Sequence, residues 1–386
     1  MTEVDMDELL ENLAQCRRCG ICRNAVYEEM GFDGVCPVWR SSAGFETSFM
    51  RGRIQVAQAL LGGKLEKTAD NAESLFTCTL CGNCTQICPA EFDPAKTLEM
   101  VRHVLRDVPN DSRDTLSKMI AINLNPYEED NSSRRNWMEE VSFDIPTKGK
   151  TLYYVGCTAG LRIPSLARST AKILRTADVG FAVLEEELCC GSVLVRTGKV
   201  TEARRNAEKL TAAIADSGAD RIVVSCSGCF RSLSKDFPEK FGIELPEVRH
   251  IIEYANELIK KGLLAPRSLD KGNRLTYHDP CHLGKEMGIY EAPREVLRAI
   301  PDVELVEMET IREAAMCCGA GGGLRSYDSE LSKKIAGDRV KSAEATGAEV
   351  LATTCPFCVA NLEAGKKQVN SKMEVVDIID LLAERL

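Results

Sequence analysis

Apolar residues follow two different spacings along this chain. In the first third they recur every three or four positions, as at Met6, Leu9, Leu10 and Leu13, which is typical of amphipathic helices. Helices are predicted there at residues 5–14, 53–61, 72–76 and 97–108. The stretch 123–136 is polar and contains Asn125-Pro126, so it is predicted to be a loop, and residues 146–150 resemble a linker.

From residue 151 onwards, short apolar runs alternate with helical stripes, and the whole series occurs twice. Strands are predicted at 151–157, 181–184 and 221–226, and again at 274–281, 303–306 and 348–355. Helices are predicted at 166–174, 201–215 and 251–258, and again at 294–299, 330–345 and 376–382. Alternating strands and helices indicate parallel βαβ units. The expected fold class is therefore α/β, with duplicated Rossmann-like domains related by a pseudo-twofold axis.

A cysteine pattern marks the same duplication. The first copy has Cys157, Cys189-Cys190-Gly191 and Cys226-x2-Cys229, and the second has Cys281, Cys317-Cys318-Gly319 and Cys355-x2-Cys358. Matching positions differ by 124 to 129 residues. Every group follows a predicted strand, and ligands of parallel sheets bind at the carboxyl ends of the strands. All five thiols of a copy are therefore expected to converge at one edge.

The N-terminal third carries eight further cysteines in two sets. One run is Cys78, Cys81, Cys84 and Cys88-Pro89, the C-x2-C-x2-C-x3-C-P signature of a cubane [4Fe–4S] cluster, and the other is Cys16, Cys19, Cys22 and Cys36-Pro37. In two-cluster ferredoxins the cysteine before proline ligates the other cluster, so Cys88 is expected to join Cys16, Cys19 and Cys22. Cys36 is expected to join Cys78, Cys81 and Cys84. Zinc ribbons use two C-x2-C pairs instead, so iron–sulfur is favoured. The 23–35 insertion is a candidate contact surface.

These patterns predict three domains, namely an α-helical ferredoxin-like domain at residues 1–146 and two repeat domains at 147–268 and 269–386. Formal net charge is −9, so a nucleic-acid surface is not expected, and the pairs Arg17-Arg18 and Arg134-Arg135 are predicted to be solvated. No apolar run approaches the roughly 18 residues of a membrane span. The acidic N-terminal residues 1–5 lack a signal-peptide core. A cytoplasmic protein is expected, able to dock at the membrane through a partner, and its eighteen cysteines are then expected to bind metal rather than form disulfides.

The cysteine spacing of both copies resembles the CCG domain of heterodisulfide reductase and of iron–sulfur subunits of glycolate, lactate and glycerol-3-phosphate oxidoreductases. Two ferredoxin motifs followed by two CCG motifs are most similar to the family of the heterodisulfide reductase D subunit. The resemblance implies two cubane clusters that feed two non-cubane [4Fe–4S] clusters, each held by five cysteines. One set is Cys157, Cys189, Cys190, Cys226 and Cys229, and the other is Cys281, Cys317, Cys318, Cys355 and Cys358.

The implied reaction is the reductive cleavage of a disulfide such as the coenzyme M–coenzyme B heterodisulfide. A disulfide needs two electrons, whereas an iron–sulfur cluster normally gives one at a time, so two facing clusters can each supply one. Two protons are also needed, and His282 and His278 flank Cys281 as candidate donors. Either histidine can instead cap a turn or hydrogen-bond a cluster sulfide.

Electrons must come from a redox partner, because no flavin or nucleotide fingerprint is visible. A flavoprotein, a hydrogenase-type subunit or a membrane cytochrome b are the candidates. Two other functions remain open, an electron-transfer subunit of a glycolate, lactate or glycerol-3-phosphate dehydrogenase complex, and a relay module in a benzoyl-CoA-reductase-type assembly. The intact first CCG motif favours catalysis. Residues 319–323 are glycine-rich and predict close backbone approach to a cluster or substrate, and Lys285, Arg325 and Arg231 are candidates to hold an acidic substrate tail.

Overall fold

The N-terminal third is built from short helices around cysteine-bearing loops. The computed structural model describes residues 4–269 and 273–386. The prediction that residues 1–5 lack a signal-peptide core falls partly on residues 1–3, which lie outside the described residues. The elements are α1 (Met6–Ala14), α2 (Ile21–Asn24), β1 (Val26–Tyr27), η1 (Glu28–Met30), β2 (Phe32–Asp33), α3 (Pro37–Ser41), η2 (Glu46–Ser48), α4 (Met50–Leu61), α5 (Ala69–Phe76), α6 (Asn83–Gln86), α7 (Pro94–Val104), α8 (Asp111–Asn123) and η3 (Asn131–Glu140). Leu9 and Leu13 of α1 pack with α4, α5 and α7 in a separate apolar core.

The first α/β unit follows as a parallel three-stranded sheet in the order β3-β4-β5. Its elements are β3 (Thr151–Tyr154), α9 (Cys157–Leu161), α10 (Pro164–Thr176), α11 (Ser192–Thr197), α12 (Val200–Ser217), β4 (Arg221–Val224), α13 (Ser227–Arg231), the π-helix η4 (Ser232–Phe241), β5 (Glu247–His250) and α14 (Ile251–Lys260). All four residues of β3 are buried, because helices cover the sheet, and such strands read as continuous apolar runs.

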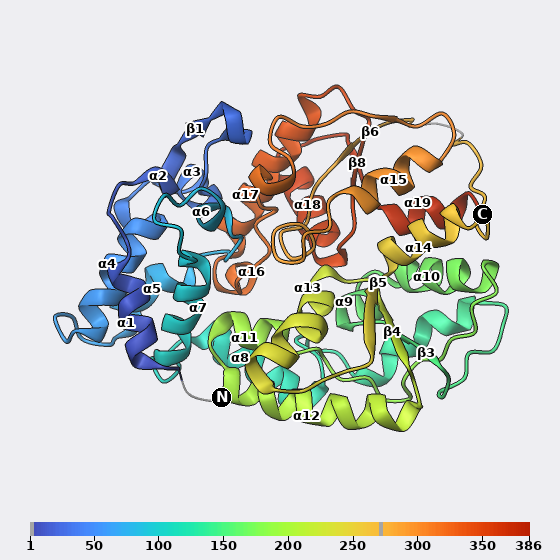
Figure 1. Cartoon of the computed structure of the whole chain (residues 1–386), viewed down its shortest axis with the longest axis horizontal. Coiled ribbons are helices and arrows are strands. Elements are labelled where there is room, and N and C mark those ends of the chain that lie inside the picture. The colour runs from blue at the N-terminus through green and yellow to red at the C-terminus, as the bar shows by residue number, and fades with distance from the viewer. Residues whose placement is uncertain (1–3, 270–272) are drawn as a thin grey trace.

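The second unit is a parallel four-stranded sheet in the order β7-β6-β8-β9. Its elements are β6 (Arg274–Tyr277), α15 (Glu291–Ala299), β7 (Glu304–Leu305), η5 (Arg312–Ala314), α16 (Leu324–Tyr327), α17 (Ser329–Glu344), β8 (Val350–Thr353), α18 (Pro356–Gln368), β9 (Glu374–Asp377) and α19 (Ile378–Glu384). Figure 1 shows the second unit above the first, with the N-terminal helices to the left of both. Between them, α10 packs on α19 and α14 packs on α15.

The mixed α/β class is confirmed, but three local predictions are wrong. The 181–184 strand is reduced to one bridge between Leu152 and Ala182, because the next residue, Val183, bonds the carbonyl of Pro146 instead of β3. Strands β5 and β9 were not predicted, because each is only four residues long, begins with a charged residue and leads directly into a helix. Part of the predicted 123–136 loop forms η3.

Arg134 is also not solvated as predicted. Helix η3 packs on α9 and places the Arg134 side chain, only 2% exposed, against the buried carboxylate of Glu187. Arg102 and Arg196 are buried arginines as well. Within the described residues, no helix has the length and apolar character needed to cross a membrane.

Candidate metal centres

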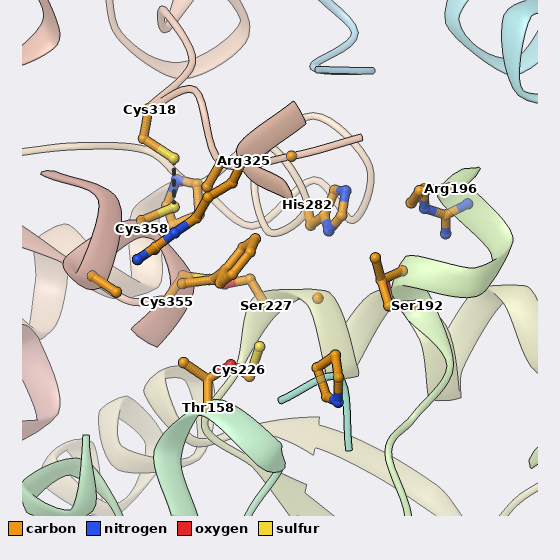
Figure 2. A pocket seen from close by; sticks show the side chains of 18 of the residues that line it. Thr158, Ser192, Arg196, Cys226, Ser227, His282, Cys318, Arg325, Cys355 and Cys358 are labelled. Atoms are coloured by element: carbon orange, nitrogen blue, oxygen red, sulfur yellow. Dashed lines mark hydrogen bonds between the residues drawn. The ribbon is translucent and has the colours of Figure 1, made fainter. Parts of the chain in front are cut away.

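The ten cysteines of the two repeats line one cavity of about 690 Å³ between the two sheets. Cys157 and Cys226 lie just beyond β3 and β4, and Cys355 lies just beyond β8. Because all strands of each sheet are parallel, their carboxyl ends meet at one edge, as the sequence predicts. Figure 2 shows Cys318, Cys355 and Cys358 on one side of this cavity and Cys226 on the other.

The two five-cysteine sets touch at their C-x2-C loops. The side chains of Cys226 and Cys355 interact with each other, although they lie far apart in the sequence. Beside them, the Ser227 hydroxyl donates to the carbonyl of Thr354 at 2.9 Å and joins the two loops. A substrate in the cavity therefore has cysteines of both sets around it.

The eight N-terminal cysteines line two smaller cavities. Cys16, Cys19, Cys22 and Cys88 share one, together with Cys84. Cys36, Cys78, Cys81 and Cys84 share the other, together with Cys22. Each cysteine before proline therefore lies with the opposite run, as the ferredoxin signature predicts. Among all eighteen cysteines, each within the described residues, only Cys19 is exposed.

Backbone contacts join the second N-terminal set to the second repeat. The side chains of Cys81 and Cys317 interact across this contact. A Cβ atom on Gly321 would lie 2.7 Å from the carbonyl oxygen of Thr79, and one on Gly322 would lie 2.3 Å from that of Cys78. The glycine-rich stretch was expected to approach a cluster or a substrate. It lines the main cavity, but its closest neighbour is this N-terminal loop.

Two histidines were candidates, and the structure places them differently. Of the four histidines, all in the described residues, only His282 lines the main cavity. It follows Cys281 but reaches the first repeat, where a Cβ on Gly228 would lie 3.6 Å from its Nδ1. Burial, with the positive charges of Arg231 and Arg196, lowers the pKa of His282 to about 3.

His278 is fully buried behind the cavity wall. Its Nδ1 accepts a hydrogen bond from Arg339 Nε at 3.2 Å, and no hydrogen-bond partner for its Nε2 is found among the described residues. One of its ring nitrogens lies within 4.8 Å of the sulfurs of Cys318 and Cys358. The ring is therefore placed against thiol sulfur rather than against open space.

The cationic candidates for a substrate tail also separate. Arg325 lines the cavity, stands 5.6 Å from the ring centroid of Phe357 and forms no ion pair with a described carboxylate. Lys285 and Arg231 do not line the cavity. Lys285 donates to the carbonyl of Ala315 at 2.6 Å, and Arg231 pairs with Glu286. Arg325 is thus the candidate that the structure leaves available.

Tyr127 is a cavity residue that sequence patterns did not indicate. Its hydroxyl lies 3.0 Å from the Thr158 hydroxyl, next to Cys157, and Arg162 stacks 4.5 Å from its ring centroid. It comes from the stretch predicted as a polar loop. The nearest signal was an aromatic residue following Asn-Pro in an otherwise polar run, which does not distinguish a cavity residue from a loop residue.

The donor chemistry fits iron–sulfur clusters. Burial raises the pKa of the Cys84 thiol well above its usual range, and the neighbouring Cys78 and Cys81 raise it further. The shifts run in both directions within these sets, since interaction with the side chain of Cys317 lowers the pKa of Cys81 and of Cys318. A thiol whose pKa is raised needs a bound cation to replace its proton. Sets of convergent thiolates without histidine or carboxylate ligands select zinc or iron–sulfur clusters, and the C-x2-C-x2-C-x3-C-P run selects the latter.

Comparison with protein families defines the class. Residues 151–234 and 275–363 match the cysteine-rich domain, called CCG, and residues 12–92 match the 4Fe-4S dicluster domain. The chain is thus an iron–sulfur protein with a dicluster region followed by two CCG repeats. A hypothetical protein from Helicobacter pylori has a similar fold, with a TM-score of 0.54 at 9% identity over 88% of this chain and 68% of that chain.

Curated relatives identify the family. The D subunit of the dihydromethanophenazine:CoB–CoM heterodisulfide reductase of Methanosarcina mazei is 37% identical over 98% of this chain and 95% of its own length. The B subunit of the fumarate reductase (CoM/CoB) of Methanothermobacter marburgensis is 28% identical over 90% of this chain and 69% of its own length. The chain belongs to the family of the heterodisulfide reductase D subunit, which confirms the resemblance in its cysteine motifs.

Proposed function

We propose that this chain is the iron–sulfur oxidoreductase subunit that reduces a disulfide, such as the coenzyme M–coenzyme B heterodisulfide, within a larger complex. The observation that carries this proposal is the single cavity lined by all ten cysteines of the two repeats. A subunit that only relays electrons does not need both cysteine sets to open onto the same cavity. The near full-length similarity to a heterodisulfide reductase D subunit supports the same function.

The proposed cofactors are two cubane and two non-cubane [4Fe–4S] clusters, and when bound they supply one-electron transfer. The cubane ligands are Cys16, Cys19, Cys22 and Cys88 for one cluster and Cys36, Cys78, Cys81 and Cys84 for the other. The non-cubane ligands are Cys157, Cys189, Cys190, Cys226 and Cys229 for one, and Cys281, Cys317, Cys318, Cys355 and Cys358 for the other.

We further propose three domains, at residues 1–146, 147–268 and 269–386, with a pseudo-twofold relation between the last two. Helices α10 and α15 follow the first strand of their copies, and α14 and α19 close them. The contacts of α10 with α19 and of α14 with α15 exchange under such a rotation. That rotation also brings Cys226 and Cys355, which occupy equivalent positions, into contact.

The proposed reaction breaks one sulfur–sulfur bond with two electrons and two protons and releases two thiols. The chain's own residues bind the disulfide between the two cysteine sets, and Arg325 is placed to pair with an anionic group on it. His282 lines the same cavity, and its lowered pKa keeps the imidazole neutral at pH 7. It is therefore the proposed proton donor through its ring N–H, while its other ring nitrogen takes a proton up. His278 is buried behind it, so we propose that it orients a sulfur by hydrogen bonding instead.

A redox partner subunit is proposed to dock where Cys19 is exposed, because the other seventeen cysteines are shielded from solvent to a greater degree. From that end, the set with Cys19 neighbours the set with Cys81, and Cys81 contacts Cys317 of the second repeat. The partner is proposed to be a flavoprotein, a hydrogenase-type subunit or a membrane cytochrome b.

The test uses the anaerobically prepared chain carrying its full iron content, which is about sixteen iron atoms for four four-iron clusters. With a reduced viologen as donor, we expect consumption of the heterodisulfide and release of both thiols. His282→Asn is expected to slow turnover about 100-fold, a typical contribution of general acid catalysis, at unchanged iron content. No disulfide reduction by the loaded protein, together with 2-hydroxy-acid-dependent reduction in its native complex, would show an electron-transfer subunit instead.

A further inference from the structure

Arg102 of α7 is a fully buried guanidinium that binds backbone carbonyls from three separate parts of the chain. Its Nε donates to Leu75 at 2.7 Å and its Nη2 to Cys78 at 2.8 Å. Its Nη1 donates to Arg196 at 2.8 Å and to Gly322 at 2.7 Å. One side chain therefore joins the second N-terminal cysteine loop, helix α11 of the first repeat and the glycine-rich loop of the second repeat.

This arrangement is costly, because buried charges in proteins are normally paired with an opposite charge. No described carboxylate forms an ion pair with Arg102, and burial lowers its pKa to about 10, so the side chain stays charged at neutral pH. Four backbone carbonyls and the face of the Phe76 ring surround it, and the charge of Glu99 acts on it without forming an ion pair. A planar guanidinium has five donors in a fixed geometry, which a lysine does not offer, so the site can hold several carbonyls in one register.

The segments that Arg102 joins are in direct backbone contact. The carbonyls of Cys78 and Thr79 leave no room for a Cβ on Gly322 or Gly321. On the other side, a Cβ on Gly198, just after α11, would lie 2.3 Å from the carbonyl oxygen of Arg102 itself. No side chain separates these backbones, so the distance between them depends on the hydrogen bonds that hold them together.

We propose that Arg102 is a positioning residue that sets the spacing between the second N-terminal cysteine set and the second five-cysteine set, and thereby the rate of electron passage between them. The inference rests on the proposed redox function of these sets. In the step concerned, one electron leaves the group held by the Cys81 set and is taken up by the group held by the Cys317 set. No proton moves and no bond to substrate breaks.

Arg113 provides a matched control. It is 2% exposed, and its guanidinium stands 5.6 Å from the ring centroid of Phe76, whereas that of Arg102 stands 5.5 Å from the same ring. It also donates to backbone carbonyls, those of Leu105 and Val108, but all of its partners lie within the N-terminal third. Loss of either arginine removes comparable local packing, and only Arg102 spans the contact between the cysteine sets.

The experiment compares Arg102→Lys with Arg113→Lys in the full, iron-loaded chain. The protein is mixed rapidly with dithionite, without any disulfide, and samples are frozen at successive times. Electron paramagnetic resonance then measures how long after the cubane clusters the non-cubane clusters become reduced. We expect Arg102→Lys to slow this passage several-fold, because the rate of electron transfer falls steeply as the distance between the two centres grows. Hydrogen exchange at the amides of residues 78–80 and 321–323 is expected to rise in Arg102→Lys and to stay unchanged in Arg113→Lys.

Equal rates of passage in wild type and Arg102→Lys at full iron content would overturn the proposal, as would equal slowing in the two variants. If Arg102→Lys does not retain iron, Gly321→Ala is used, because its added Cβ separates the loops without touching Arg102. Slowed passage in Gly321→Ala supports the proposal, and unchanged passage overturns it. This experiment uses no substrate. If the wild type fails to reduce a disulfide, the proposed function is therefore wrong, but the measured effect of Arg102 on electron passage still stands.

Discussion

The ion pair between Arg134 and Glu187 is predicted to hold the first repeat's cysteine loops in place. The Glu187 carboxylate accepts hydrogen bonds from the backbone N–H groups of Val155 and Gly156, both at 2.8 Å, directly before Cys157. Arg134 Nη1 lies 3.1 Å from its Oε1 and also donates to its carbonyl oxygen. Burial raises the pKa of Glu187, while the charge of Arg134 and the two N–H groups oppose the rise.

The perturbation is Glu187→Gln, which keeps the shape and leaves the Arg134 charge buried without an opposite charge beside it. The two side chains are 4% and 2% exposed, so we expect a loss of about 3–5 kcal/mol in the free energy of unfolding, the cost of breaking a buried pair. Removing both charges with Arg134→Met and Glu187→Gln should cost less, about 1–3 kcal/mol for the lost hydrogen bonds. The double variant is therefore predicted to be more stable than the single one.

Urea unfolding of the iron-loaded chain tests this through Trp137, which packs 6.2 Å from the ring centroid of Tyr153 in β3. Trp39→Phe removes the other of the two tryptophans, so that fluorescence reports on the first repeat. The matched control is Glu140→Gln, whose partner Arg168 is at the surface, with an expected cost below about 1 kcal/mol. Equal costs for the buried and surface variants, or a double variant less stable than Glu187→Gln, would refute the reasoning.

Two further predictions concern stability. Burial alone would raise the pKa of Glu99, but the charges of Arg196 and Lys240 outweigh it and lower the pKa. The ionised carboxylate therefore stabilises the fold above the unfolded pKa of about 4.3, and this stabilisation is lost as pH falls. Glu99→Gln should make the free energy of unfolding depend less steeply on pH in the acid range. An unchanged pH dependence would contradict this prediction. Gly319 has φ +85°, and a Cβ atom added to it would lie 2.5 Å from the carbonyl oxygen of Ser332. Gly319→Ala should therefore lower the free energy of unfolding by about 1–2 kcal/mol or more, measured by thermal unfolding. Gly180→Ala, with open space around it, should be nearly neutral, and equal effects would exclude strain as the cause.

Local features of this chain were predictable because they depend on neighbouring residues. The cysteine spacing identified both N-terminal sets, since short spacings constrain which sulfurs can meet. The two-cluster ferredoxin signature, rather than spacing, predicted that Cys36 and Cys88 exchange between the sets. The duplicated strands and the convergence of ten thiols at their ends followed from apolar runs and from parallel topology. Long amphipathic helices such as α12 and α17 were placed within a few residues, because a helical stripe extends over several turns.

Short edge strands were not predictable. Residues 247–250 and 374–377 form strands only because β4 and β8 offer free backbone groups beside them. Conversely, residues 181–184 have strand propensity but pair at a single bridge, since the chain turns to Pro146. Backbone pairing with a distant partner decides these segments, and local propensity does not report it.

Only the tertiary structure decided how the sets are connected. The contacts of Cys226 with Cys355 and of Cys81 with Cys317 join residues more than 100 positions apart, so no spacing rule reaches them. Arg102 looked like an ordinary polar position of an amphipathic helix, and Tyr127 like part of a loop. Their positions depend on packing between segments far apart in the sequence. The sequence encodes the faces that pack, whereas their mutual position depends on many contacts made at once.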